Sequence, residues 1–228
     1  MPLDTKAFRT RTLTAVAFVI IMLAGLLWNQ WSFIVLFIII HFGCWYEFVR
    51  LIKKINPEQY LLISIAGLAY ITLPVLILLG MRTGGDIFTD NKYLMIVPCG
   101  IIFSIWVNDT MAYIVGSLIG KTPLSKISPK KTWEGTMGGA LLCILTITLT
   151  GHATGFYSYK DWIVISTGCA VFGTWGDLLE SKLKRMAGVK DSGTILPGHG
   201  GFLDRFDSLL VASVSVGIYY FLFMQVIK

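Results

Sequence analysis

Charged residues are scarce in this sequence of 228 residues: Asp, Glu, Lys and Arg together make up 14%, whereas soluble domains average about 25%. Hydrophobic residues make up 55%, and the mean hydropathy is +0.71. This balance excludes a disordered chain, a collagen-like fibre and a coiled coil. The four cysteines lie in apolar runs and form no Cys-x-x-Cys pair, which argues against a zinc site or a disulfide scaffold and predicts buried thiols.

The apolar residues are gathered into runs that are long enough to cross a bilayer, which takes roughly 20 residues. The sequence therefore predicts an all-α, polytopic integral membrane protein with about seven transmembrane helices. We expect the first run to be a retained helix and not a cleaved signal peptide, since no Ala-x-Ala site ends it. The fourth run fits either one long helix or two short pieces. The runs are Thr12–Trp28, Trp31–Val49, Tyr60–Gly80 (with a kink expected at Pro74), Tyr93–Ile119, Gly135–Thr150, Trp162–Trp175 and Ser208–Ile227.

The basic residues predict the orientation of these helices. With seven spans and a cytoplasmic N-terminus, 15 of the 19 Lys and Arg residues fall on the cytoplasmic side. The four on the other side are Arg82, Lys92, Lys160 and Lys228. This asymmetry follows the positive-inside rule, so the net charge of +6 needs no nucleic-acid partner.

Carboxylates cluster where two of the apolar runs meet the cytoplasmic side. Asp177 ends the sixth run, while Asp204 and Asp207 precede the seventh and share one helix face at a spacing of three. Ionisable groups at the edge of a span are costly unless they are paired, solvated or bound to metal. Hard oxygen ligands beside phosphate groups favour Mg²⁺. The alternative is that these carboxylates only pair with nearby basic residues, such as Lys184 and Arg185.

A glycine-rich segment, Pro197–Gly201, precedes the last run and has the composition of a phosphate-binding loop. Glycine-rich turns are common, so this segment alone is a weak signal, and a lone His199 is more often structural. Lys130 and Lys131 could equally be anchors at the membrane surface. Taken together, clustered carboxylates, basic residues and a glycine-rich loop indicate phosphoryl or nucleotidyl transfer between a soluble and a lipid-borne substrate.

These residues also resemble a known signature. The segments Ser181–Arg185, Lys190–Gly193 and Leu196–Asp207, with their spacing, resemble the motif of the phosphatidate cytidylyltransferases (CDP-diacylglycerol synthases). Gly176–Ser181, Asp109–Tyr113 and Ile127–Gly135 fit the same family. The matching motifs divide the chain into membrane helices in residues 1–107 and a catalytic membrane region in residues 108–228, within one integrated domain.

The resemblance implies transfer of the cytidylyl group of CTP to phosphatidate, giving CDP-diacylglycerol and pyrophosphate. It implies Mg²⁺ as cofactor, a monovalent cation such as K⁺ as a further candidate, membrane lipid and a second copy of the chain as partners, and a site facing the cytoplasm from the inner (plasma) membrane. The catalytic residues it implies are Asp177, Asp204, Asp207, Lys184 and Asp191, of which the first three would hold metal. The substrate-binding residues it implies are Ser128, Lys130, Lys131, Glu180, Arg185, Lys190, Gly198, His199, Gly200, Gly201 and Arg205.

Two other functions fit parts of the pattern. A CTP-dependent lipid-alcohol kinase, or a cytidylyltransferase for another phospholipid, would have a similar site and a different lipid pocket. A transporter with an ion site is the alternative outside the enzymes. Transporter sites usually lie near the bilayer midplane between repeated halves, whereas here the carboxylates cluster at one side and the two halves show no repeat.

Overall fold

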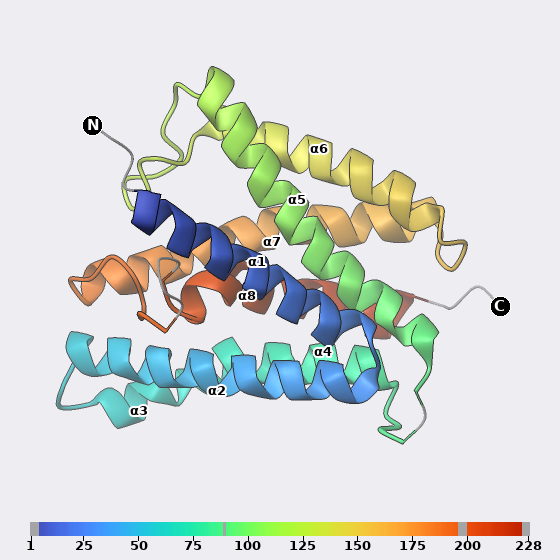
Figure 1. The fold of residues 1–228 in the computed structure, drawn as a ribbon, viewed down its shortest axis with the longest axis horizontal. Coiled ribbons are helices and arrows are strands. Elements are labelled where there is room, and N and C mark those ends of the chain that lie inside the picture. The colour runs from blue at the N-terminus through green and yellow to red at the C-terminus, as the bar shows by residue number, and fades with distance from the viewer. Residues whose placement is uncertain (1–4, 89, 196–199, 225–228) are drawn as a thin grey trace.

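The computed structural model of this chain describes residues 5–88, 90–195 and 200–224 (Figure 1). These residues form helices joined by loops, and an isolated β-bridge joins Pro123 and Thr132. The helices are α1 (Thr5–Leu27), α2 (Gln30–Ile55), α3 (Tyr60–Ser64), the π-helical η1 (Leu68–Thr72), α4 (Leu73–Thr83), the 3-10 helix η2 (Lys92–Met95), α5 (Ile96–Ile119), α6 (Trp133–His152), α7 (Tyr159–Met186) and α8 (Leu203–Phe223).

These elements confirm the all-α, polytopic membrane architecture. In the described residues, six segments are long and apolar enough to cross a membrane: Gln30–Ile55, Tyr60–Thr83, Lys92–Ile119, Trp133–His152, Tyr159–Met186 and Leu203–Phe223. The apolar part of α1, Thr12–Leu27, is shorter. The count of seven spans and the side on which the N-terminus lies therefore stay predictions.

Two local features of the sequence have clear structural outcomes. The fourth apolar run is not divided into two pieces: its first three residues lie in η2, and the rest forms one helix, α5, with Val107 and Asn108 in its middle. The third span is irregular just before Pro74, where η1 forms a π-helical turn. Proline has no N–H to donate to the carbonyl four residues earlier, which favours such an irregularity.

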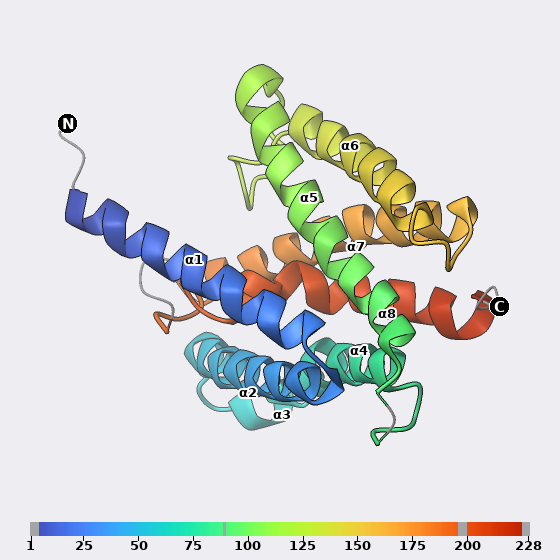
Figure 2. The same cartoon turned by 45° about the vertical axis from the view of Figure 1, so that its right-hand side comes forward.

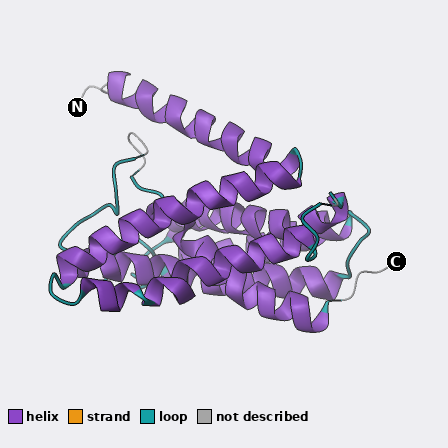
Figure 3. Cartoon of the chain, turned by 90° about the horizontal axis from the view of Figure 1, so that it is seen from below, coloured by secondary structure: helices purple, strands orange, loops and turns teal. Residues whose placement is uncertain are grey.

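The helices pack in a consistent order. Helices α7 and α8 lie side by side, with α5 and α6 on one side of them and α2 and α4 on the other (Figures 1 and 2). Helix α1 diverges from the rest toward its N-terminal end (Figure 3), and it is anchored through Met22 and Leu26, which are buried. All four cysteines are buried and free, as predicted.

Close helix contacts depend on small residues. A Cβ on Gly139 would come within 2.7 Å of the Ala112 backbone nitrogen in α5, and one on Gly135 within 2.9 Å of Gly116 Cα. Glycine at these positions therefore allows α5 and α6 to approach closely, as is common between membrane helices.

The chain direction places the loops with predicted chemistry together. The start of α1, the α2–α3 turn, the α5–α6 loop and the α7–α8 loop all lie at one end of the molecule, on the left in Figure 1. We call this the polar end. The segments predicted to carry the cytoplasmic basic residues thus share one end of the bundle.

Candidate active site at the polar end

An ion pair joins the α5–α6 loop to α7. Lys131 Nζ lies 2.6 Å from Asp177 Oδ2, and both side chains are partly exposed (33% and 27%). Asp207 lies beside this pair on α8, 6% exposed, and its Oδ1 accepts a hydrogen bond from the Ser208 backbone N–H at 2.6 Å. The charges of Asp177, Asp109 and Lys131 all act on Asp207. Lys131 therefore contacts one carboxylate, that of Asp177, and Asp109 and Asp207 are near enough for their charges to interact with this pair.

A glycine sets the distance between the two helices here. A Cβ on Gly176 would clash with the backbone oxygen of Asp207 and approach Ser208 Cα to 3.1 Å. Gly176 therefore lets the start of α8 pack directly against α7. This close packing places Asp177 and Asp207 on facing parts of the two helices.

A second charge cluster is buried one turn further along α7. Lys184 Nζ lies 2.5 Å from Glu180 Oε2 and 2.6 Å from Asp204 Oδ1. Their side chains are 13%, 0% and 6% exposed, respectively. One ammonium thus holds a carboxylate from α7 and another from α8 in a desolvated setting, where breaking the pairing is costly.

The other oxygen of Asp204 is bound by the chain itself. Asp204 Oδ2 accepts hydrogen bonds from the Ser192 N–H at 2.9 Å and the Gly201 N–H at 2.8 Å, and Ser192 Oγ lies 3.0 Å away. Both oxygens of Asp204 are therefore engaged, and its carboxylate ties α8 to Ser192 and Gly201 in the α7–α8 loop.

The α5–α6 loop that carries Lys131 is itself held by hydrogen bonds. Glu134 accepts from the Lys121 N–H at 3.1 Å and from Thr122 Oγ1 at 2.8 Å. Thr132 caps α6 by accepting from the Gly135 N–H at 3.1 Å. These bonds fix the base of the loop, so that Lys131 extends from an ordered segment toward α7.

The remaining predicted residues occupy the surface around these clusters. Ser128 and Lys130 lie in the α5–α6 loop, with Lys130 exposed; Arg185, Lys190, Asp191 and Arg205 are also exposed; and Gly200 and Gly201 precede α8. Gly198 and His199 lie outside the described residues. The structure therefore brings Lys131, Asp177 and Asp207 together, and Lys184, Glu180 and Asp204 together, as two neighbouring clusters.

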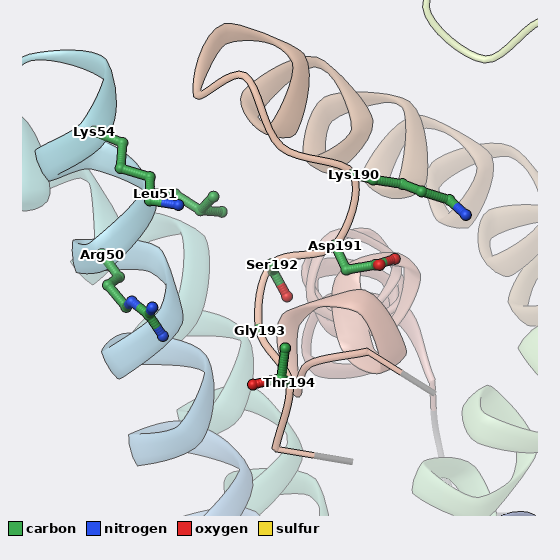
Figure 4. A pocket seen from close by; sticks show the side chains of 8 residues that line it. All are labelled: Arg50, Leu51, Lys54, Lys190, Asp191, Ser192, Gly193 and Thr194. Carbon is green, nitrogen blue, oxygen red and sulfur yellow. The ribbon is translucent and has the colours of Figure 1, made fainter. Parts of the chain in front are cut away.

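A cavity of about 220 Å³ opens between α2 and the α7–α8 loop (Figure 4). Arg50 and Lys54 project into this region from the last turns of α2, while the Lys190 and Asp191 side chains extend away from α2. The lining residues are Arg50, Leu51, Lys54 and Lys190–Thr194.

The sequence predicts a metal site formed by Asp177, Asp204 and Asp207. Within residues 5–88, 90–195 and 200–224, no three His, Cys, Asp or Glu side chains are arranged to hold a metal ion. Asp204 is bound by Lys184 and the loop. Asp177 is paired with Lys131 through one oxygen, and no loop amide is bonded to it as to Asp204. Mg²⁺ commonly binds one or two carboxylates and completes its shell with substrate phosphates and water, so Asp177 and Asp207 are the two candidate ligands.

Two acidic residues in this region were given no role from the sequence. Asp109 falls in a recognised motif; its charge interacts with that of Asp207, and its Oδ1 accepts a hydrogen bond from Asn108 at 3.4 Å. Glu47 lies in α2, is fully buried and accepts hydrogen bonds from the α7–α8 loop. A lone carboxylate inside an otherwise apolar run was the available signal for Glu47.

Comparison with known proteins gives matches over most of the chain. The sequence profile described as the Cytidylyltransferase family matches residues 76–223. A phosphatidate cytidylyltransferase of Rickettsia bellii is 33% identical over 214 residues, which cover 89% of this chain and 86% of that protein.

Other relatives match over shorter stretches. Phosphatidate cytidylyltransferase 5, chloroplastic, of Arabidopsis thaliana is 47% identical over 51% of this chain and 29% of its own length. A phosphatidate cytidylyltransferase of Staphylococcus saprophyticus is 50% identical over 46% of this chain and 42% of its own. The chain thus spans less than half the length of these two relatives. From the profile match and the near full-length similarity, this chain belongs to the cytidylyltransferase family.

Proposed function

We propose that this chain transfers the cytidylyl group of CTP to phosphatidate, giving CDP-diacylglycerol and pyrophosphate. This is the first nucleotide activation in phospholipid biosynthesis. The names of the relatives support the substrates. The observation that carries the proposal is the paired arrangement at the polar end, where Lys131 contacts Asp177 beside the buried Asp207 and Lys184 joins Glu180 to Asp204.

The chemistry suits such a site. An oxygen of the phosphatidate phosphate attacks the α-phosphorus of CTP, and the bond from that phosphorus to the bridging oxygen of the β-phosphate breaks. The second pKa of a phosphate monoester is about 6, so the nucleophile is already an anion at neutral pH and needs no strong base. The main barrier is the repulsion between this anion and the triphosphate, and fixed cations reduce it.

The basic residues would bind the negatively charged phosphate groups of the substrates. Lys131 and Lys184 are held in place by carboxylates, which orients their ammonium groups before substrate arrives. Lys130, Arg185, Lys190 and Arg205 are exposed and lie close to them in the sequence or at the start of α8; they would bind phosphate oxygens, with Asp191 orienting the neighbouring bases. Gly198, His199, Gly200, Gly201 and Ser128 complete the proposed substrate-binding set.

We further propose that the reaction depends on Mg²⁺ held by Asp177 and Asp207. When bound, the ion would neutralise phosphate charge in the reaction. Asp204 could join as a third ligand only if its oxygens leave Lys184 and the loop amides. A monovalent cation such as K⁺ and a homodimer are proposed on the resemblance alone.

The proposed location is the inner (plasma) membrane, with the polar end facing the cytoplasm. The distribution of Lys and Arg supports this orientation, and so does the gathering of the basic loops at one end of the bundle. CTP would reach the site from water, and phosphatidate would reach it from the bilayer.

The test uses purified protein in liposomes containing phosphatidate, with CTP labelled on the α-phosphate and Mg²⁺. We expect label in the lipid fraction and release of pyrophosphate, both abolished by EDTA and by Asp207→Asn. Label passing only from γ-labelled CTP to a lipid alcohol would identify a kinase instead. No transfer in either assay would contradict the enzyme assignment and favour a transporter.

A further inference from the structure

Glu47 connects the N-terminal half of the molecule to the proposed active site. It lies on α2, outside residues 76–223 that match the family profile, and its side chain is fully buried. Glu47 Oε2 accepts hydrogen bonds from Ser192 Oγ at 2.6 Å and from the Leu203 N–H at 2.9 Å, and Oε1 accepts from the Phe202 N–H at 3.0 Å.

These bonds cap α8 from another helix. The first N–H groups of a helix have no partner within it, and a negative charge there is favourable. The N-cap residue of α8, Phe202, provides no side-chain cap. Glu47 binds two of the N–H groups at this end, and Asp204 binds that of Gly201. The helix that carries Asp204 and Asp207 therefore starts on a carboxylate supplied by α2.

The surrounding sequence accommodates this carboxylate. A Cβ added to Gly193 or to Gly201 would clash with the carboxyl group of Glu47. Both glycines thus leave the space that lets the loop close over Glu47. The Ser192 hydroxyl lies between the two carboxylates, 2.6 Å from Glu47 and 3.0 Å from Asp204, so the position of one is linked to that of the other.

We infer that Glu47 is a positioning residue for the proposed cytidylyl transfer: it fixes the α7–α8 loop and the start of α8, and through Ser192 it fixes Asp204. This inference rests on the proposed function for its catalytic part. Glu47 would touch no substrate and would act only through the groups that it holds.

The test compares Glu47→Gln with Glu58→Gln, a matched change at an exposed position in the α2–α3 turn. The first readout is hydrogen–deuterium exchange of the amides of Ser192, Phe202 and Leu203. We expect these amides to exchange at least about tenfold faster in Glu47→Gln and unchanged in Glu58→Gln. The second readout is kinetic, per folded molecule: we expect kcat to fall about tenfold or more while KM for CTP changes less than threefold.

Two results would overturn the inference. One is a lower yield of folded protein with an unchanged kcat per folded molecule, which would indicate a purely structural role for Glu47. The other is unchanged hydrogen–deuterium exchange of the three amides. If Glu47→Gln does not fold, Ser192→Ala, which removes the Ser192 Oγ contacts to Glu47 and Asp204, must speed exchange of the Phe202 and Leu203 amides and lower kcat; no change in either would overturn the inference. If the wild-type protein transfers no cytidylyl group, the proposed function fails, and the role of Glu47 as a clamp on the loop is judged by the exchange data alone.

Discussion

Lys131 Nζ lies 2.6 Å from Asp177 Oδ2. This ion pair joins the α5–α6 loop to the part of α7 that we propose faces the cytoplasm. Its neighbour Lys130 is exposed and makes no ion pair among the described residues. Two adjacent lysines with the same chemistry therefore have different surroundings. Of these two lysines, Lys131 is the one held beside a carboxylate of the proposed reaction site.

This difference predicts a specific effect of removing the Lys131 charge. Lys131→Met should lower kcat on the order of 100-fold, because a positioned cation is lost where negative charge develops. Lys126→Met, an exposed change in the same loop, should leave the rate within about twofold, given that isolated surface charges contribute little. Cytidylyl transfer into phosphatidate liposomes measures both. Equal rates for the two variants would contradict the role of Lys131.

The cluster around Asp207 predicts the metal dependence. Asp207→Asn should abolish turnover while the protein still inserts and folds, since the change keeps the side-chain size and removes a ligand charge. Asp177→Asn should raise the Mg²⁺ concentration needed for half-maximal activity, and EDTA should stop the wild-type enzyme reversibly. Asp204→Asn is also expected to lose turnover. Near wild-type turnover of Asp207→Asn at saturating Mg²⁺, or an unchanged Mg²⁺ requirement of Asp177→Asn, would show that the metal assignment of that residue is wrong.

The buried cluster at Lys184 predicts a stability effect. Lys184→Met leaves Glu180, which is 0% exposed, and Asp204, which is 6% exposed, without their cation. Removing one partner of a buried pair costs about 3–5 kcal/mol, so the melting temperature in detergent should fall clearly. Lys182→Met, on the exposed side of the same helix, serves as the control.

A double variant separates this pairing effect from lost packing. Lys184→Met combined with Glu180→Gln should recover part of the lost stability, because one of the two unpaired carboxylates is gone. If the double variant melts no higher than Lys184→Met, the loss comes from packing and not from the unpaired charge.

Two glycines on α7 make a matched pair for testing the contact between α7 and α8. Gly176→Ala places a Cβ against the backbone of Asp207, whereas Gly173→Ala places one 3.6 Å from Ser208 Cβ, an ordinary contact. Gly176→Ala should cost about 1–3 kcal/mol, as overpacking does, and should also reduce activity by moving Asp207 away from Asp177. Gly173→Ala should leave both the stability and the transfer rate unchanged. Melting curves and transfer rates on both variants decide this.

Much of the fold could be predicted from local sequence. An apolar run of about 20 residues in a bilayer must satisfy its own backbone hydrogen bonds, so a helix is the available structure. The runs ending at Ile119 and Thr150 therefore correspond closely to α5 and α6. The spacing between Ser181 and Asp207 likewise pointed to the family, because that motif is nearly continuous along the chain.

The sequence by itself determined the helical membrane architecture, the segments that hold the polar chemistry and the family. Only the tertiary structure decided the partners: that Lys131 reaches Asp177, that Asp204 is occupied by Lys184 and Ser192, and that Glu47 caps α8. Periodicity and spacing describe contacts within one helix or loop, whereas these contacts join segments from different parts of the chain. The geometry of these contacts depends on how the helices and loops pack against each other. Glycines at positions 176, 193 and 201 leave the space for this packing, but the local sequence around them does not show which segment fills that space.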